Sequence, residues 1–327
     1  MTEPDRDPGE PPVVAEVTRS GVVESVHRAH VAIVDAHGEL VAAAGNATAA
    51  ILPRSCNKPL QAIGMLECGL ELPAELLALA GASHAGEPFH VDGVRRILAG
   101  AGLDEAALQN PPDVPSDPDA RAAWMAAGDW PRPVAMNCSG KHAAMLATCA
   151  LRGWPTASYL DPNHELQRRL SRAVSEHTSD PAPAVAVDGC GAPVFAASLE
   201  GLARAFGRIA SASDGSATTR VADAFRAYPE WASGTRRDES LLHRQVPGLM
   251  TKAGAEGTYA VGLRDGRGLA VKVDDGAARP RPVIVNSLLQ AMGVSCQPAA
   301  FAITGGSADV GEIRATRVVA ELGRLAS

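Results

Sequence analysis

The chain has 327 residues, a net charge of −7 at pH 7 and 46% hydrophobic residues, a composition typical of a globular protein with a large core. The acidic balance and the lack of basic runs argue against nucleic acid and anionic membranes as partners. No apolar stretch reaches the roughly 20 residues of a membrane-spanning helix. Residues 1–12 are acidic and proline-rich without an apolar signal core, so we expect a disordered tail and a cytoplasmic location. The length allows one large domain or two smaller ones. In the cytoplasm the six cysteines are expected to be thiols or metal ligands.

The predicted strands lie at both ends of the chain. Runs rich in β-branched residues cover 13–17, 22–35 and 40–44, and turn-linked runs follow at 258–263 and 268–273. Helical patterns fill the middle of the chain, and a buried strand is expected at 184–187. The end of the chain is predicted to form one more strand followed by a loose segment. The helices are expected within 59–108, at 120–127, after 136, at 164–177, 198–211 and 217–227, near 240, and at 282–292. This order predicts an α+β fold, in which an antiparallel sheet from the N- and C-terminal segments carries the helical middle.

A Ser-x-x-Lys pattern marks the start of the first predicted helix. Ser55 and Lys58 are three residues apart, and Pro59 fits only a first helical turn. This spacing stacks both side chains on one face of the helix. A neutral lysine amine can take the proton of a serine nucleophile, and the helix N-terminus favours the resulting alkoxide. An N-cap serine beside a solvated lysine is the alternative interpretation.

Lysine is rare in this chain. Lys58, Lys141, Lys252 and Lys272 are the four lysines among 30 basic residues, and the rest are arginines. Lysine can lose its proton in a protein, whereas arginine in practice cannot. Each lysine is therefore a candidate for chemistry, although codon bias would leave the same pattern.

Further short motifs follow the Ser-x-x-Lys pattern in order. They are Ala82-Ser83-His84, Asn137-Cys138-Ser139-Gly140-Lys141-His142, Asp188-Gly189-Cys190 and Lys252-Ala253-Gly254-Ala255-Glu256-Gly257. Taken alone, Ser83 is better interpreted as a helix N-cap than as a reactive hydroxyl. For Cys138 and Cys190, two buried thiols are the alternative to metal ligands. Together, and with similar gaps, the motifs resemble the L-asparaginase II family, the rhizobial-type or class 3 asparaginases. The resemblance runs from about residue 13 to the C-terminus and implies one catalytic domain over residues 13–327.

The resemblance implies a site and a fold. Two Ser–Lys pairs are implied, Ser55 with Lys58 and Ser83 with Lys252, on a fold similar to serine β-lactamases and glutaminases. The implied zinc ligands are Cys138, Lys141 and Cys190, with Arg54 and Asp188 close by as substrate-binding residues. We also expect a homodimer. Lys272 matches a family pattern but has no assigned role.

The expected reaction is hydrolysis of L-asparagine to L-aspartate and ammonia through a serine acyl-enzyme. Ser55 is the predicted nucleophile and Lys58 its base, while Ser83 and Lys252 relay protons; Ser83 as nucleophile is the alternative. Zinc is expected to position substrate rather than to activate water, with water, Asp188 or His142 as a further ligand. A glutaminase, another serine amidohydrolase of this fold, or a non-catalytic zinc-binding protein are the other functions left open.

Overall fold

The computed structural model describes residues 10–181 and 184–326. The chain divides into two compact units, each described here by itself. The single catalytic domain over residues 13–327 stays a prediction. The sheet unit comprises Met1–Ile51, Ser198–Ser211 and Gln245–Ser327, and the helical unit comprises Leu52–Ala197 and Ala212–Arg244. Residues 1–9 of the predicted tail lie outside the described residues, whereas Pro11 and Pro12 are buried and accept hydrogen bonds from Arg28 and Ala29.

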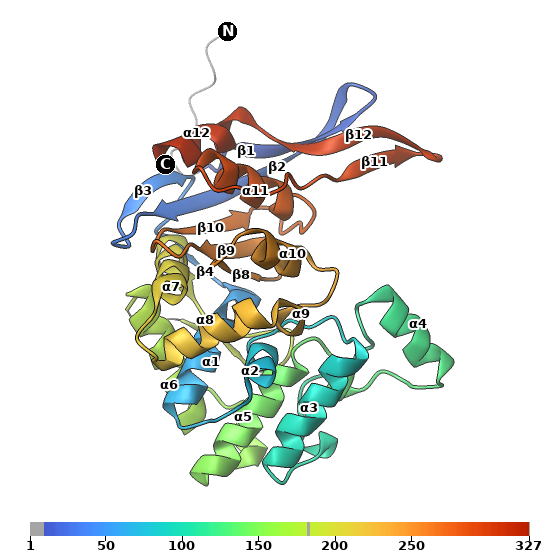
Figure 1. The fold of residues 1–327 in the computed structure, drawn as a ribbon, viewed down its shortest axis with the longest axis vertical. Helices are drawn as coiled ribbons and strands as arrows, with labels where there is room; N and C mark the ends of the chain where they lie inside the picture. The colour runs from blue at the N-terminus through green and yellow to red at the C-terminus, as the bar shows by residue number, and fades with distance from the viewer. Residues whose placement is uncertain (1–9, 182–183, 327) are drawn as a thin grey trace. The chain divides into compact units, whose positions relative to one another are not determined.

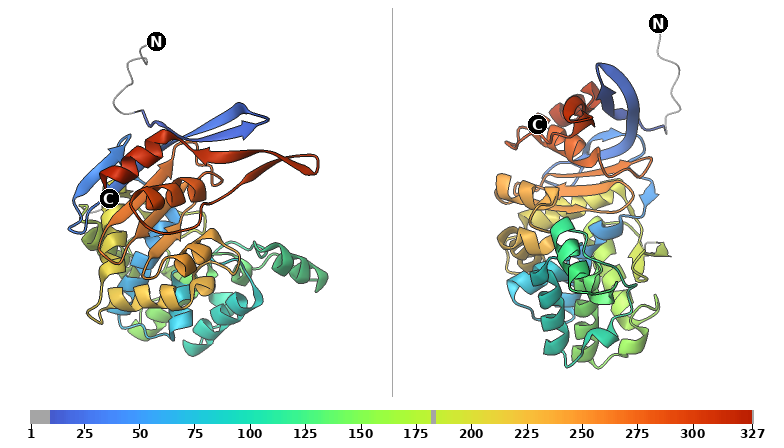
Figure 2. Two further views of the ribbon diagram at one scale, coloured as in Figure 1. Left: turned by 45° about the horizontal axis from the view of Figure 1, so that its top comes forward. Right: turned by 90° about the vertical axis from the view of Figure 1, so that its right-hand side faces the viewer.

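The sheet unit is built on one antiparallel sheet of eight strands. Its order is β11-β12-β1-β2-β10-β9-β8, and β3 pairs with β2 beside this path. Strands from the two ends of the chain therefore lie side by side in one sheet, and Figures 1 and 2 show them as neighbouring blue and red ribbons. This arrangement confirms the predicted α+β fold. The strands are β1 (Val13–Arg19), β2 (Val22–Val34), β3 (Leu40–Ala44), β8 (Met250–Ala253), β9 (Thr258–Gly262), β10 (Gly268–Val273), β11 (Ala302–Gly305) and β12 (Ala308–Ala315).

Helix α7 (Leu199–Ser211) packs closely on β9 and β10. Glycines make this approach possible, because a Cβ on Gly262 would lie 1.9 Å from the Phe206 carbonyl oxygen. A Cβ on Gly268 would lie 2.0 Å from the Ala203 carbonyl oxygen. The helix buries an apolar stripe that includes Leu202 and Phe206, which forms part of the core of this unit.

The C-terminal segment is ordered, which corrects the expectation of a loose end. It forms α12 (Arg317–Leu325), which packs against α11 (Arg281–Ala291). Val319 and Leu322 lie one turn apart and are buried. Gly323 lets the two helices approach, since a Cβ there would lie 2.4 Å from the Ala291 Cβ. The short apolar stripe of α12 becomes visible only once its partner helix is known.

The helical unit is organised around α1, in which residues 58–66 are all buried. This helix packs against α6, α8 and α5. Full burial explains why α1 carries so few charged side chains. The helices of the middle segment are α1 (Lys58–Glu67), α2 (Ala74–Ala80), α3 (Pro88–Gly100), α4 (Pro118–Ala126), α5 (Ser139–Arg152), α6 (Glu165–Thr178), α8 (Ala217–Ala227), α9 (Pro229–Ala232) and α10 (Asp238–Gln245).

The strand expected to be buried at 184–187 is exposed. It is β5 (Val185–Val187), and Val185 and Val187 are 47% and 79% exposed. β5 pairs with β6 (Pro193–Phe195), whose residues are all buried. In this two-stranded ribbon β6 packs against α6, and a short apolar run alone does not reveal which strand is covered.

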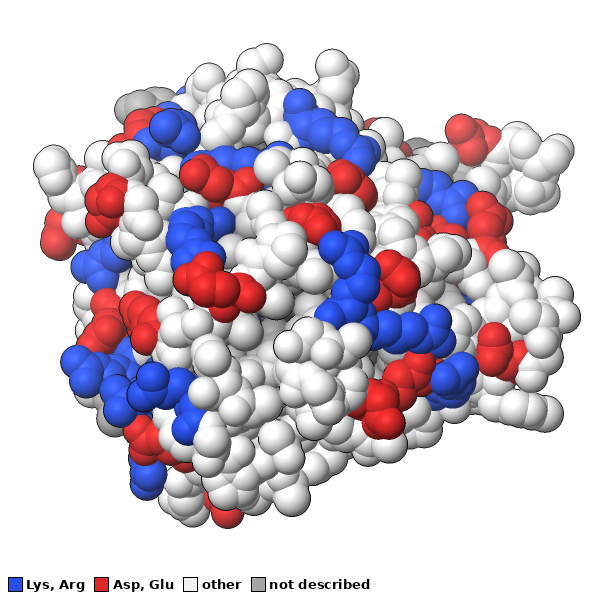
Figure 3. Space-filling view, turned by 60° about the horizontal axis from the view of Figure 1, so that its bottom comes forward, with Lys and Arg blue, Asp and Glu red and all other residues white. Residues whose placement is uncertain are grey.

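Two surface properties bear on the possible partners. None of the described helices is long and apolar enough to cross a membrane. On the face shown in Figure 3, acidic and basic side chains of the described residues are interspersed, without a broad basic patch. Such a mixed surface lacks the positive stripe that follows a nucleic-acid backbone.

Candidate active site

The segment before α1 carries Arg54, one of the two predicted substrate-binding residues, which contacts the other, Asp188. A 3-10 turn, η1 (Arg54–Asn57), runs directly into α1, and Pro59 lies in the first turn as predicted. Arg54 has a left-handed φ of +53°, which is uncommon for a residue with a side chain. Its Nε donates to Asp188 Oδ1 at 2.6 Å. The two residues therefore form an ion pair beside the predicted nucleophile.

Asp188 is ionised in this setting. Burial alone would raise the pKa of its carboxyl group, but the positive charges of Lys141, Arg54 and Lys58 outweigh burial and lower the pKa. The site therefore presents one carboxylate and one guanidinium side by side. These are the groups that recognise the ammonium and carboxylate of an amino acid.

Lys58 is the centre of the site. Its side chain is 1% exposed. The amine donates to the Ala82 carbonyl oxygen at 2.6 Å, to Ser83 Oγ at 2.9 Å and to Cys138 Sγ at 3.1 Å. Lys58 thus links α1 to the loop after α2 and to the start of α5. This contact with a serine and a cysteine could not be read from the Ser-x-x-Lys spacing.

The two candidate serines are both half-buried, so each is open to a substrate. Ser83 is in hydrogen-bond contact with the Lys58 amine. Ser55 lies one turn before Lys58, and its carbonyl oxygen accepts the Lys58 backbone N–H. Neither η1 nor α1 has a side-chain cap, so the reading of Ser55 as an N-cap is not supported. The predicted side-chain pairing of Ser55 with Lys58 stays a prediction.

A buried histidine holds the loop that carries Ser83. His84 Nδ1 accepts the Gly86 backbone N–H at 3.1 Å, which places the ring proton on Nε2. Nε2 then donates to Ser139 Oγ at 2.8 Å, and Ser139 donates to the Val134 carbonyl oxygen at 2.8 Å. Burial lowers the pKa of His84 well below its usual value, so the ring is neutral. Sequence analysis placed His84 in a motif but gave it no role, because its partner is 55 residues away.

Two thiols and an amine meet at the start of α5. Lys141 Nζ donates to Cys190 Sγ at 3.2 Å, and both residues are buried. A hydrogen bond from Cys190 and the charges of Lys58 and Lys141 lower the pKa of Cys138 well below its usual value, against the effect of burial. The pKa of Cys190 is raised by the same bond and by burial. The three residues predicted as zinc ligands thus come together, with Cys138 disposed to be the thiolate.

His142 adds a donor atom to this cluster. Its Nδ1 lies 2.7 Å from the Tyr159 hydroxyl, while its buried Nε2 has no hydrogen-bond partner among the described residues. Burial lowers the pKa of His142 to about 4, against the effect of the nearby Cys190 thiol, so the ring is neutral at pH 7. A neutral imidazole nitrogen is a donor that metal ions accept. Tyr159, which fixes the ring, was missed because nothing in its sequence context indicates a role.

The predicted zinc ligands do not form a conventional metal cluster. Within the described part of the chain, no three histidine, cysteine, aspartate or glutamate side chains form a group that could hold a metal. The predicted set has two such residues, and its third member is the Lys141 amine. The two thiols are soft donors of the kind that zinc prefers. Lys141, however, donates a proton to Cys190, and although burial lowers its pKa, the nearby Cys190 and Cys138 outweigh burial and raise it. Lys141 would have to lose that proton to bind a metal, so zinc at Cys138, Lys141 and Cys190 stays a prediction.

The other two lysines belong to the sheet unit. Lys252 lies on β8, is 1% exposed, and its amine donates to the Ala253 carbonyl oxygen at 2.9 Å. Lys272 lies on β10, and its amine donates to the carbonyl oxygens of Glu256 and Val273. The predicted pairing of Ser83 with Lys252 involves both units and stays a prediction.

Comparison with known proteins gives a family match. The family model described as L-asparaginase II matches residues 15–320. No curated protein matches the chain. Among solved structures, it is similar to "EstCE1, a hydrolase with promiscuous acyltransferase activity", with 13% identity, a TM-score of 0.35, and coverage of 82% of this chain and 91% of that one.

Proposed function

Because the chain belongs to the L-asparaginase II family, we propose that it hydrolyses L-asparagine to L-aspartate and ammonia. The observation that carries this proposal is the buried Lys58 amine, 2.9 Å from the Ser83 hydroxyl. A lysine so placed serves as a general base once it is neutral. A half-buried hydroxyl beside it gives the substrate access to the reacting group.

The proposed reaction proceeds through an acyl-enzyme. Ser55 Oγ attacks the side-chain amide carbon, the C–N bond breaks, and ammonia leaves. Ser83 passes the proton of the attacking hydroxyl to Lys58, which accounts for the contact between these two residues. The Lys58 ammonium then returns this proton through Ser83 to the amide nitrogen, so that the nitrogen leaves as ammonia. Water then cleaves the ester and releases aspartate. Lys252 is the proposed second base for this water, as the family resemblance implies.

Ser83 as nucleophile is the competing assignment, and the contact with Lys58 favours it. In that case Lys58 would deprotonate the attacking hydroxyl directly, without a relay. Both assignments need the neutral Lys58 amine. They differ in which serine carries the acyl group.

Arg54 and Asp188 are the proposed substrate-binding pair. Arg54 Nε lies 2.6 Å from Asp188 Oδ1, and the two side chains carry opposite charges. An amino acid carries the complementary pair, an α-carboxylate for Arg54 and an α-ammonium for Asp188. We propose that the substrate shares this ion pair, which would fix the orientation of its amide.

Zinc is proposed to be held by Cys138, Lys141 and Cys190. When bound, the metal supplies a positive charge that positions a polar group of the substrate. Freshly purified active protein should contain about one zinc per chain. Cys138→Ala and Cys190→Ala should lose it and raise KM more than they lower kcat, while Cys296→Ala in the sheet unit keeps it. Active protein without zinc would remove this part of the proposal.

Ammonia release from L-asparagine and L-glutamine tests the activity. The two substrates differ by one methylene, which a binding pocket distinguishes by about 10- to 200-fold in kcat/KM. We expect the preference to favour asparagine. A preference for glutamine would make the protein a glutaminase, and no release from either would favour a non-catalytic zinc-binding protein. The homodimer and the cytoplasmic location remain expectations from the sequence.

A further inference from the structure

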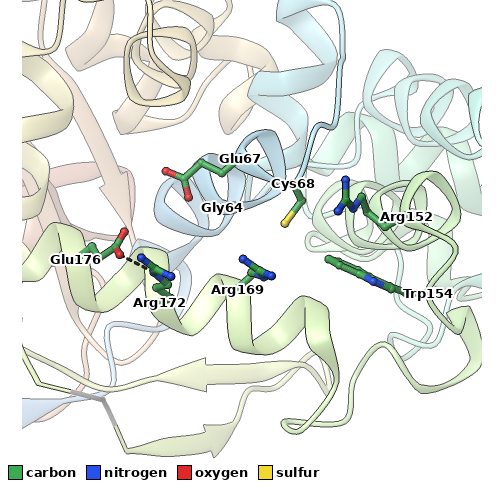
Figure 4. Close-up of a pocket in the computed structure, with 8 residues that line it drawn as sticks. All are labelled: Gly64, Glu67, Cys68, Arg152, Trp154, Arg169, Arg172 and Glu176. Atoms are coloured by element: carbon green, nitrogen blue, oxygen red, sulfur yellow. Dashed lines mark hydrogen bonds and ion pairs between the residues drawn. The ribbon is translucent and has the colours of Figure 1, made fainter.

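A pocket lies within the helical unit, at the far end of α1. Its volume is about 390 Å³, and it is lined by the end of α1, the end of α5 with the loop that follows, and α6 (Figure 4). Lys58 begins α1 and Cys68 caps its end. A helix of ten residues is about 15 Å long. The pocket is therefore separate from Lys58 and from the candidate active site.

One side of the pocket is cationic. The Arg152 guanidinium lies over the Trp154 ring, 5.7 Å from its centroid, and no carboxylate among residues 10–181 and 184–326 pairs with it. Arg169 uses its Nε to bind Glu165 at 2.8 Å, and its guanidinium points into the pocket in Figure 4. Both positive charges act on the buried Cys68 thiol, where they partly offset the increase in its pKa that burial causes. The two guanidiniums therefore converge on the same space.

The other side of the pocket carries two carboxylates. Glu176 is neutralised by Arg172, whose Nε lies 2.6 Å from Glu176 Oε1. Glu67 is exposed, and across the described residues it forms no ion pair. Figure 4 shows Glu67 near Arg172 and Glu176, away from Arg152 and Trp154. Glu67 is thus available to a positive group of a ligand.

We propose that this pocket is a second, non-catalytic site for a small acidic amino acid. The ligand's carboxylates would bind the forked donors of Arg152 and Arg169, and its ammonium would bind Glu67. Of the three arginines that line the pocket, Arg152 has no carboxylate partner among the described residues, so a carboxylate of the ligand would supply one. The volume lies at the small end of the range of about 300–1,000 Å³ for ligand sites.

The identity of the amino acid rests on the proposed function, because L-aspartate is the product of the proposed reaction. A pocket that binds this product away from the active site would let the enzyme respond to product concentration. The site itself is defined by the charges that line it, and its occupancy can be measured without turnover.

Tryptophan fluorescence of the full chain during titration with L-aspartate tests the proposal. We expect a saturable change that disappears in Trp154→Phe, while calorimetry shows that this variant still binds. Arg169→Gln should weaken binding about tenfold or more, since it removes charged hydrogen bonds. Arg95→Gln is the matched control, because Arg95 lies on α3, outside the pocket, and pairs with Glu105. Circular dichroism checks that each variant is folded.

Succinate separates the two charged sides of the pocket, because it has both carboxylates but no ammonium. Wild-type protein should prefer L-aspartate, and Glu67→Gln should lose that preference. The proposal is overturned by an absent saturable change, by an equal change with sodium chloride at matched ionic strength, or by unaltered binding in Arg169→Gln. Ammonia release fails or succeeds independently of this outcome, so a missing pocket ligand and a missing asparaginase activity are distinguishable.

Discussion

The two nucleophile assignments differ in how a proton reaches the Lys58 amine: directly from Ser83, or from Ser55 through Ser83. With Ser83 as the relay, Ser55→Ala should abolish turnover and acyl-enzyme formation. Ser83→Ala should retain a slow acyl-enzyme, with a rate lower by about 10²–10⁴, as for the loss of general-base assistance. Ser55 caps no helix with its side chain, so its replacement should change stability by less than about 0.5 kcal/mol.

Mass spectrometry of the protein mixed with substrate would identify the acylated serine. Near-normal turnover in Ser55→Ala with an inactive Ser83→Ala would reverse the assignment. Ser83 would then be the nucleophile that Lys58 deprotonates directly.

A second residue-scale prediction concerns pH and stability. Burial lowers the pKa of His90 to about 4, against an unfolded value near 6.5. Between these values the unfolded chain binds a proton that the folded chain does not. Stability should therefore fall as pH decreases from about 6.5 to 4, with His90 contributing up to about 1.4 kcal/mol per pH unit.

Urea denaturation at several pH values between 7 and 4.5 measures this slope. His90 Nδ1 accepts the Glu87 N–H, and Nε2 reaches the Glu230 carbonyl oxygen. His90→Gln keeps polar atoms near Glu87 and Glu230 but has no group that titrates in this pH range. The variant should be less stable than wild type at pH 7, and its free energy of unfolding should change less with pH. An unchanged slope in this variant would show that His90 does not contribute.

At the scale of elements, the start of α5 is fixed by its approach to α2. A Cβ on Gly140 would lie 2.5 Å from the Leu79 carbonyl oxygen, and a backbone atom cannot move aside cheaply. Gly140→Ala should therefore destabilise the protein by about 1–3 kcal/mol. Because Gly140 lies between Cys138 and Lys141, zinc content should fall as well.

Gly100→Ala is the matched control for this substitution. Gly100 ends α3, and a Cβ there would meet nothing within 4 Å. Alanine at such a position should be neutral or stabilise the helix by up to about 1 kcal/mol. Thermal unfolding of the two variants compares them directly. Equal stability of Gly140→Ala and wild type would mean that α5 tolerates displacement from α2.

At the same scale, sequence patterns predicted the positions of helices more accurately than they predicted which strand is exposed. The predicted helices at 164–177 and 217–227 correspond to α6 and α8 within one residue, because their apolar residues recur at helical spacing. The prediction that β5 is buried was wrong, because a three-residue apolar run has no periodicity to reveal its covered side. Helix α12 was missed because its stripe is short and depends on α11.

At the scale of the whole molecule, the sheet was predictable and the contacts of the site were not. Alternating apolar residues at both ends of the sequence are enough to indicate one antiparallel sheet. The contact of Lys58 with Ser83 joins residues 25 positions apart, on a loop held by His84 and Ser139. Local spacing pointed instead to Ser55, since a pattern of four residues carries no information about such a loop.

The four lysines give the most direct test of the proposed chemistry. Lys58 and Lys252 are proposed to carry protons, so each must spend time as a neutral amine. Arginine keeps the charge and roughly the reach, but its pKa above about 12 prevents useful deprotonation. Activity of the wild type should rise with pH toward an optimum above neutrality, as the amines lose protons.

The decisive measurement is kcat of Lys58→Arg, Lys252→Arg and Lys272→Arg, compared side by side with circular dichroism as a check of folding. The first two should lose about 10²–10⁴ in rate, and Lys272→Arg should keep most of its activity. Substantial kcat in both Lys58→Arg and Lys252→Arg would contradict the account, because the lysines would then act only as fixed charges.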